Sequence, residues 1–174
     1  MFTKQNVLGA VAAVAVMASS AMAQMPAKPW SFGVQAGASM PMGDFGDAAN
    51  AGFNVGGNAR FKLTGVPVAI QGEVLYNSFG GKTVSTVSLP TMNVLGFGGA
   101  ASWAMPSGLY FIGGLGMYNM SCDGCTSTTK VGLNLGAGFN LPLSFGAFIE
   151  ARYHTVMTET KNTNFLPIAF GIRF

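Results

Sequence analysis

The chain has 174 residues and a formal net charge of +3; 49% of its residues are hydrophobic, 9% are charged and 25 are glycine. So few charges disfavour an ordinary soluble surface, where about a quarter of the residues are charged, and the many aromatic and branched residues exclude a disordered chain. The lysines and arginines form no cluster, so the charge does not indicate a nucleic-acid partner. The length suits one domain.

The first 23 residues have the organisation of an export signal. Lys4 precedes an uninterrupted apolar run at 7–17, and an A-x-A cleavage pattern ends at Ala23. The run is shorter than the about 20 apolar residues that a membrane-spanning helix needs. We therefore interpret 1–23 as a secretory signal peptide that is cleaved, and 24–174 as a single exported domain.

Eight segments of the exported domain alternate apolar residues with polar or small ones, which is the pattern of β-strands with one apolar face. In the first segment Trp30, Phe32 and Val34 share a face, and in the last the alternation continues to Phe174. In chain order the segments span 30–40, 53–63, 68–77, 91–103, 108–120, 130–141, 144–154 and 164–174. Two middle segments are apolar or small on both faces. We expect their outward residues to be Leu95, Phe97, Trp103, Phe111, Leu115 and Met117.

The connections between these segments alternate in length. Short turns are expected at 64–66, 105–107 and 141–143, and longer polar stretches at 41–52, 79–90, 121–129 and 157–163. Short turns at one rim and longer loops at the other are typical of an up-and-down barrel that spans a membrane. Segments of this length match the roughly 9–11 residues that a tilted strand needs to cross a bilayer.

The positions of the charges distinguish a membrane barrel from a soluble sandwich. The polar face of a sandwich would meet water and carry many lysines and glutamates, whereas here it is mostly glycine, serine, asparagine and glutamine. Lys130 opens the sixth segment, and the remaining charged residues within the segments all project from that face: Arg60, Lys62, Glu73, Glu150, Arg152 and Arg173. A lysine or arginine facing lipid near the midplane costs about 2–4 kcal/mol. We therefore expect the apolar face to point outward into hydrocarbon and the polar face to point inward.

Backbone physics requires such strands to close. An unpaired amide in lipid costs several kcal/mol, so strands span a membrane only as a closed barrel. The pattern predicts an all-β fold, an eight-stranded antiparallel up-and-down transmembrane β-barrel in which the last strand pairs with the first. Phe174 would then lie at the membrane boundary in an aromatic girdle with Trp30, Trp103 and Phe145.

This pattern resembles the small outer-membrane β-barrel proteins of Gram-negative-type bacteria, the OmpA/OmpX-like family. The signal peptide, the eight alternating segments and the terminal Phe170-Gly171-Ile172-Arg173-Phe174 carry the resemblance. It implies a bacterial outer-membrane location. It also implies that the barrel-assembly machinery reads Phe170, Ile172 and Phe174 as a C-terminal assembly signal.

The polar residues expected in the lumen form the candidate site: Arg60, Lys62, Glu73, Glu150, Arg152, His154 and Arg173. Glu73 and Glu150 could form an acid–base pair, but an eight-stranded barrel is only wide enough to be filled by its own side chains. Buried carboxylates need cations, and the turn at Gly65 would bring Asn58 opposite Glu73 and Arg60 diagonal to it. We expect a structural ion network that also blocks ion flow.

His154 is the only histidine, and Thr155 and Glu159 lie near it in the sequence. Some small barrels are enzymes that act on lipid A, so these residues permit a hydrolase-like interpretation. Such an enzyme would need its nucleophile and its base together on the lipid side. Alternation places His154 on the lumen face and Thr155 on the opposite face, so we expect no catalytic residues.

Cys122 and Cys125 form a CxxC in a polar stretch. In an oxidising compartment this pair favours a loop disulfide over a redox thiol, and it offers two of the four ligands of a structural zinc site. The acidic residues of 41–52 do not follow calcium-loop spacing. The glycine-rich run at 113–116 is not followed by a helix that would bind phosphate. We expect no metal and no cofactor, and we expect the glycines to relieve crowding in the lumen.

These expectations favour a non-enzymatic, monomeric outer-membrane barrel with a structural or surface-interaction role. Its partners would be outer-membrane lipid and, during biogenesis, the barrel-assembly machinery. The alternatives are a lipid-modifying outer-membrane enzyme and a narrow channel. The loop compositions name no external ligand.

Overall fold

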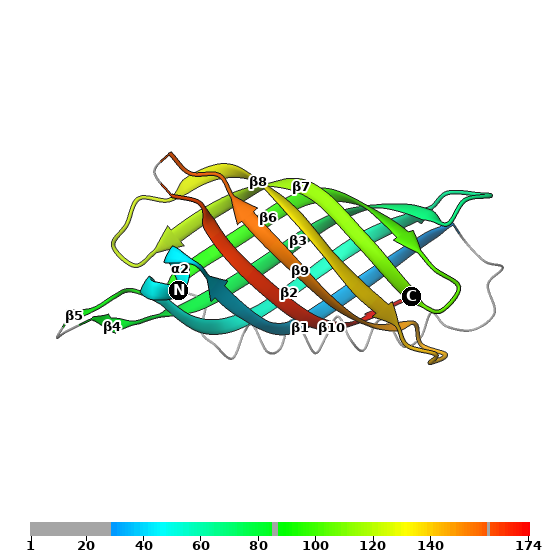
Figure 1. The fold of residues 1–174 in the computed structure, drawn as a ribbon, viewed down its shortest axis with the longest axis horizontal. Coiled ribbons are helices and arrows are strands. Elements are labelled where there is room, and N and C mark those ends of the chain that lie inside the picture. The colour runs from blue at the N-terminus through cyan, green and yellow to red at the C-terminus, as the bar shows by residue number, and fades with distance from the viewer. Residues whose placement is uncertain (1–28, 85–86, 160) are drawn as a thin grey trace.

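The computed structural model describes residues 29–84, 87–159 and 161–174, and the predicted signal peptide at 1–23 lies outside them. Eight strands form a closed antiparallel barrel with the order β1-β10-β9-β8-β7-β6-β3-β2 (Figure 1). The barrel strands are β1 (Trp30–Met42), β2 (Ala49–Lys62), β3 (Val68–Gly81), β6 (Met92–Ala104), β7 (Leu109–Cys122), β8 (Thr128–Asn140), β9 (Ala147–Val156) and β10 (Thr163–Arg173). The predicted eight-stranded barrel is confirmed.

The barrel closes where the last strand meets the first. The β1–β10 register runs from Gly33 opposite Arg173 to Met42 opposite Asn164. Beyond it, the N–H groups of Phe32 and Phe174 each donate to the carbonyl of the other residue at 2.9 Å. The apolar alternation continues to the C-terminus because this strand is a seam that must present one apolar face and pair on both edges.

The two ends of the barrel differ in their connections (Figure 1). Three short turns, at 63–67, 105–108 and 141–146, lie with the C-terminus at one end, which we call the short-turn end. The other, the long-loop end, carries the helix α2 (Asp44–Ala48) and a hairpin of β4 (Thr83–Val84) and β5 (Val87–Ser88). The connections 123–127 and 157–162 complete this end.

Strand boundaries depart from the predicted ones mainly toward the long-loop end. Residues 41–42, 49–52 and 79–81, expected in loops, belong to strands. Polar composition suggested loops there, but an antiparallel neighbour supplies backbone hydrogen bonds whatever the side chain. The opposite error occurs at β9, which begins at Ala147 and not at residue 144, because Gly146 turns the chain with a φ of 65°.

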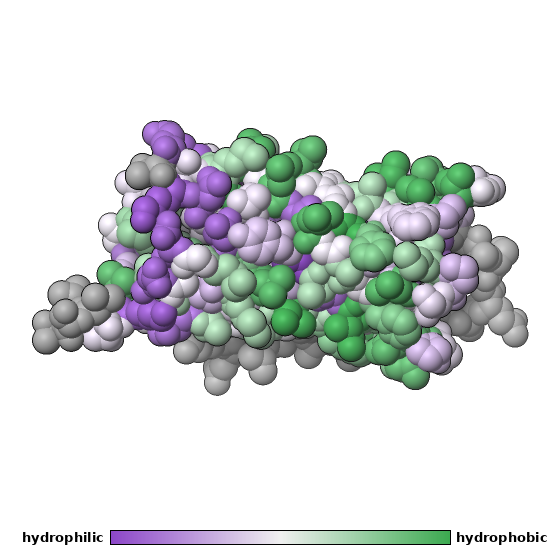
Figure 2. All heavy atoms as spheres, in the orientation of Figure 1, coloured by the Kyte–Doolittle hydropathy of each residue, from purple (hydrophilic) through white to green (hydrophobic). Residues whose placement is uncertain are grey.

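The outer face of the barrel is apolar. Phe97, Trp103, Phe111, Leu115 and Met117, which the sequence assigned outward, are each 45–63% exposed. Figure 2 shows hydrophobic residues over the middle and the short-turn part of the visible face, and hydrophilic residues gathered at the long-loop end. Among the described residues, no helix is long and apolar enough to cross a membrane.

The lumen is filled by side chains that form layers along the barrel. An apolar cluster occupies the part nearest the long-loop end: Phe45, Ala49, Phe79, Val94, Tyr118, Val156 and Phe165, with Met92 and Met120 packed against it. A smaller cluster of Ala100, Tyr110 and Ile112 lies nearer the short turns. Polar and charged side chains fill the space between them.

Inward-facing glycines allow large side chains to fit in this narrow lumen. Tyr110 lies over its cross-strand partner Gly138, where a Cβ atom would approach the Tyr110 Cζ to 2.2 Å. Phe148 likewise lies over its partner Gly171, where a Cβ would be 2.3 Å from the Phe148 Cζ. Real Cβ contacts are not this short, so a side chain at either glycine would clash with the ring. The crowding that the sequence suggested therefore arises, at these two positions, from the Tyr110 and Phe148 rings.

Candidate functional site

The centre of the lumen holds an ion triad around Arg152. Its Nη1 lies 2.6 Å from Glu73 Oε1, and its Nε lies 2.8 Å from Glu150 Oε1. The three side chains are 3–8% exposed. Glu150 and Arg152 share the inward face of β9, whereas Glu73 comes from β3, which lies half-way around the barrel. The Arg152–Glu73 pair therefore ties opposite walls together across the lumen.

From the triad, hydrogen bonds continue to the short-turn end. The Tyr110 hydroxyl donates to Glu150 Oε2 at 2.7 Å, and Arg173 Nη2 donates to the Tyr110 oxygen at 3.2 Å. Arg173 Nη1 also donates to Asn140 Oδ1 at 2.7 Å. The Arg173 guanidinium lies 3.7 Å from the centre of the Phe148 ring, a cation–π contact. These contacts fill the lumen beside the short turns.

In the other direction the network reaches the apolar cluster. Arg152 Nη1 donates to Asn134 Oδ1 at 3.4 Å, and Asn134 Nδ2 donates to the Tyr118 hydroxyl oxygen, also at 3.4 Å. The Tyr118 hydroxyl is 2.8 Å from His154 Nδ1. The His154 ring stacks on Phe165 with a centroid distance of 5.0 Å and an interplanar angle of 15°. The described contacts thus run without a break from the apolar cluster to Arg173.

Two predicted members of the cluster do not join the triad. In the β2–β3 register Asn58 is opposite Glu73, and Arg60 is opposite Gln71, two positions nearer the short turns, which places it diagonal to Glu73; both placements are as predicted. Arg60 donates to Ser102 Oγ at 2.9 Å and lies 5.6 Å from the centre of the Tyr110 ring, so it makes no ion pair with Glu73. The prediction that Lys62 belongs to the lumen cluster is wrong. Lys62 is the last residue of β2, and its side chain is exposed at the barrel rim because the lumen ends there.

A second polar layer was not singled out from the sequence. Ser39 Oγ donates to Asn77 Oδ1 at 2.7 Å, and Asn54 Nδ2 donates to Ser39 Oγ at 3.1 Å. Asn54 and Asn77 are cross-strand partners in the β2–β3 register. Alternation places both residues on the polar face, but they are uncharged, and the predicted cluster consists of charged residues and His154. The buried amides were the signal that would have found them, because buried amides need partners.

The remaining candidate groups do not form a catalytic arrangement. His154 is 1% exposed inside the barrel, and Thr155 lies on the outward face of β9. Glu159 is exposed in the 157–162 connection, where a 2.7 Å hydrogen bond from Lys130 lowers its pKa. These three groups therefore have separate surroundings.

The cysteines and the possible metal ligands lie elsewhere. Cys122, at the end of β7, and Cys125, in the following connection, form a disulfide at the long-loop end. Among residues 29–84, 87–159 and 161–174, no group of three or more histidine, cysteine or acidic residues is arranged to hold a metal ion.

The residues of the proposed assembly signal face outward at the seam. Phe170 is 49% exposed and Phe174 is 38% exposed, and Ile172 lies between them on the same face of β10. Trp30, Trp103 and Phe145 are likewise exposed and belong to the short-turn end. An aromatic belt therefore surrounds this end of the barrel, as expected for a membrane interface.

Comparison with known proteins agrees with this architecture. Residues 9–174 match the family model described as outer membrane protein beta-barrel domain. No curated protein sequence matches the chain.

Solved structures share the fold at low sequence identity. Ail, the attachment invasion locus protein of Yersinia pestis, is 17% identical with a TM-score of 0.58, over 84% of this chain and 99% of Ail. Neisserial surface protein A is 18% identical with a TM-score of 0.60, over 86% of this chain and 98% of that protein. The N-terminal barrel domain of Pseudomonas aeruginosa OprF is 16% identical with a TM-score of 0.51, over 84% and 98% of the two chains.

Proposed function

The chain belongs to the outer membrane protein beta-barrel domain family, and from this premise we propose that it is a monomeric bacterial outer-membrane barrel with a structural or surface-interaction role. One observation carries the proposal. A continuous network of ion pairs, hydrogen bonds and aromatic contacts fills the lumen of a barrel whose outer face is apolar. Such a molecule is built to sit in lipid with its interior closed, which leaves the loops as the part that meets other molecules.

The filled lumen argues against transport through the barrel. Two carboxylates and one guanidinium meet at 2.6–2.8 Å in the triad, and an ion passing through would have to separate them. Breaking a buried ion pair by removing one partner costs about 3–5 kcal/mol. The apolar cluster at the long-loop end adds a second barrier, because its side chains other than Tyr118 have no polar group to replace an ion's hydration shell.

The long-loop end supports a surface role in which net charge has little part. Its lysines are engaged: Lys130 pairs with Glu159 at 2.7 Å, Lys161 pairs with Asp44 at 3.3 Å, and Lys82 donates to the Gly46 carbonyl. Ail has been solved in complex with the heparin analogue sucrose octasulfate. A surface whose lysines are paired is not expected to attract such a polyanion, so recognition here would rest on polar and apolar contacts.

The proposed assembly route depends on the C-terminal strand. Phe170, Ile172 and Phe174 face outward on β10, which pairs with β1 at the seam that closes the barrel. We infer that the barrel-assembly machinery reads these residues and that outer-membrane lipid surrounds the apolar face. No nucleic-acid partner is proposed.

Membrane fractionation, gel mobility, bilayer recordings and lipid A analysis test the proposal. After expression with its own N-terminal segment in a Gram-negative host, the protein should fractionate with the outer membrane. It should also migrate differently in heated and unheated samples on SDS gels. In planar lipid bilayers we expect no discrete single-channel conductance. Reproducible openings would instead support the narrow channel, and altered lipid A acylation that disappears with His154→Ala would support the enzyme.

A further inference from the structure

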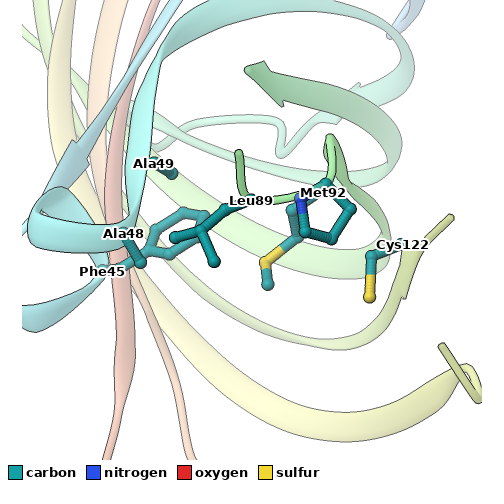
Figure 3. Close-up of a pocket in the computed structure, with 7 residues that line it drawn as sticks. Phe45, Ala48, Ala49, Leu89, Met92 and Cys122 are labelled. Atoms are coloured by element: carbon teal, nitrogen blue, oxygen red, sulfur yellow. The ribbon is translucent and has the colours of Figure 1, made fainter. Parts of the chain in front are cut away.

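A small apolar cavity lies at the long-loop end, outside the polar network. Its volume is about 150 Å³, and its lining residues are Phe45, Ala48, Ala49, Leu89, Pro90, Met92 and Cys122. Figure 3 shows Phe45, Leu89 and Met92 near one another, with Ala48 and Ala49 on one side and Cys122 on the other. The walls come from α2, the start of β2, the connection that leads into β6, and the end of β7. The cavity is thus bounded by segments far apart in the sequence.

Contacts outside the cavity hold its lining residues in place. The Phe45 ring packs edge-on against Phe79, with a centroid distance of 4.9 Å and an interplanar angle of 78°. Asp44, at the start of α2, pairs with Lys161 at 3.3 Å. On the far side Cys122 is fixed by its disulfide with Cys125. The ring contact and the disulfide therefore hold the Phe45 and Cys122 walls in place without a ligand, and walls that are already ordered reduce the entropic cost of binding.

The lining restricts the chemistry of the ligand. None of the lining side chains carries a charge or an N–H or O–H group, so a polar molecule would lose hydration without gaining hydrogen bonds. An engineered apolar cavity of about 150 Å³ binds benzene, and the volume here is similar. The Met92 thioether adds a favourable contact for an aromatic ring. A full-length lipid acyl chain is larger than this space.

We propose that this cavity is a binding site for a small uncharged molecule about the size of a single aromatic ring. The site opens at the end of the barrel that carries the loops. It draws on the same apolar cluster that closes the lumen, because Phe45 and Ala49 belong to both, and Met92 packs against that cluster. The proposal goes beyond the structural or surface-interaction role and does not depend on it.

The test uses the folded protein in lipid nanodiscs with ¹³C-labelled methionine methyl groups. Benzene is titrated while the Met92 methyl reports the cavity and the Met117 methyl, on the lipid face, reports benzene dissolved in lipid. Met92→Leu identifies the Met92 signal. We expect a saturable shift at Met92, a non-saturating or absent shift at Met117, and no Met92 response to benzoate, whose charge the lining cannot accommodate.

Two substitutions locate the binding. Ala48→Phe should fill the cavity and abolish the saturable shift, whereas Ala101→Phe, which adds the same ring on the lipid-facing side of β6, should preserve it. If Ala48→Phe does not give the heat-sensitive gel mobility of a folded barrel, Leu89→Trp fills the cavity from another wall. Equal, non-saturating shifts at Met92 and Met117, or saturation that persists in a folded cavity-filled variant, would overturn the proposal. Neither outcome bears on conductance or membrane location.

Discussion

Arg152→Met is the sharpest test of how the lumen is held together. In the native barrel the guanidinium neutralises Glu73 and Glu150 at 2.6 and 2.8 Å, and all three side chains are nearly inaccessible. Methionine keeps much of the volume but leaves Glu73 without its cation and Glu150 with only Arg173 Nη2, at 4.0 Å. Removing one partner of a buried ion pair costs about 3–5 kcal/mol. With a urea slope of about 2 kcal/mol/M, the unfolding midpoint should fall by about 1.5–2.5 M.

The assay follows the folded band on unheated gels, or tryptophan fluorescence, during reversible urea unfolding in lipid vesicles. Arg60→Met is the matched control. It also removes a buried guanidinium, but Arg60 bonds to Ser102 and leaves no paired carboxylate behind, so we expect a cost of at most about 1–2 kcal/mol. Adding Glu73→Gln and Glu150→Gln to Arg152→Met should recover most of the loss, because the triad then contains no charge.

The reasoning is refuted if Arg152→Met and Arg60→Met shift the midpoint equally. It is also refuted if the uncharged triple variant is no more stable than Arg152→Met. Equal shifts would mean that the cost reflects lost volume or general desolvation and not the cross-lumen pairs. A stable Arg152→Met variant would mean that water reaches the carboxylates, so that the lumen is open to solvent.

Three further predictions follow from the same geometry. Gly138→Ala should lower stability by about 1–3 kcal/mol, because the new Cβ meets the Tyr110 ring at 2.2 Å; Gly72→Ala, which meets nothing within 4 Å, should leave the urea midpoint nearly unchanged. Phe174→Ser should reduce the fraction of heat-modifiable protein in outer membranes. Refolding of the purified variant in detergent should be less affected, and a matching loss in both assays would argue against recognition by the assembly machinery. Sucrose octasulfate should give no measurable heat of binding at physiological ionic strength, and micromolar affinity would show that the loop lysines are more accessible than their pairing implies.

The sequence by itself determined the class of the fold and the direction of most side chains. Alternation has a period of two, so once lipid excludes Arg60, Glu73 and Arg152 from one face, every residue of those strands is assigned to a side. That rule places Trp103 and the other predicted outward residues on the lipid side. It also places His154 and Thr155 on opposite faces and carries the alternation to the seam at Phe174. The sequence also indicated which kinds of side chain must pair, since a buried carboxylate needs a cation wherever it lies.

The tertiary structure decided which inward residues meet. Arg152 pairs with Glu73 from half-way around the barrel, and such a contact depends on the stagger of the strands and the diameter of the closed barrel. Neither quantity is encoded in local periodicity. The same applies to Phe45, which lies in a polar stretch of sequence but packs into the mouth of the barrel through α2. The face that a residue occupies is a local property of its strand, whereas a contact across the lumen exists only once the barrel has closed.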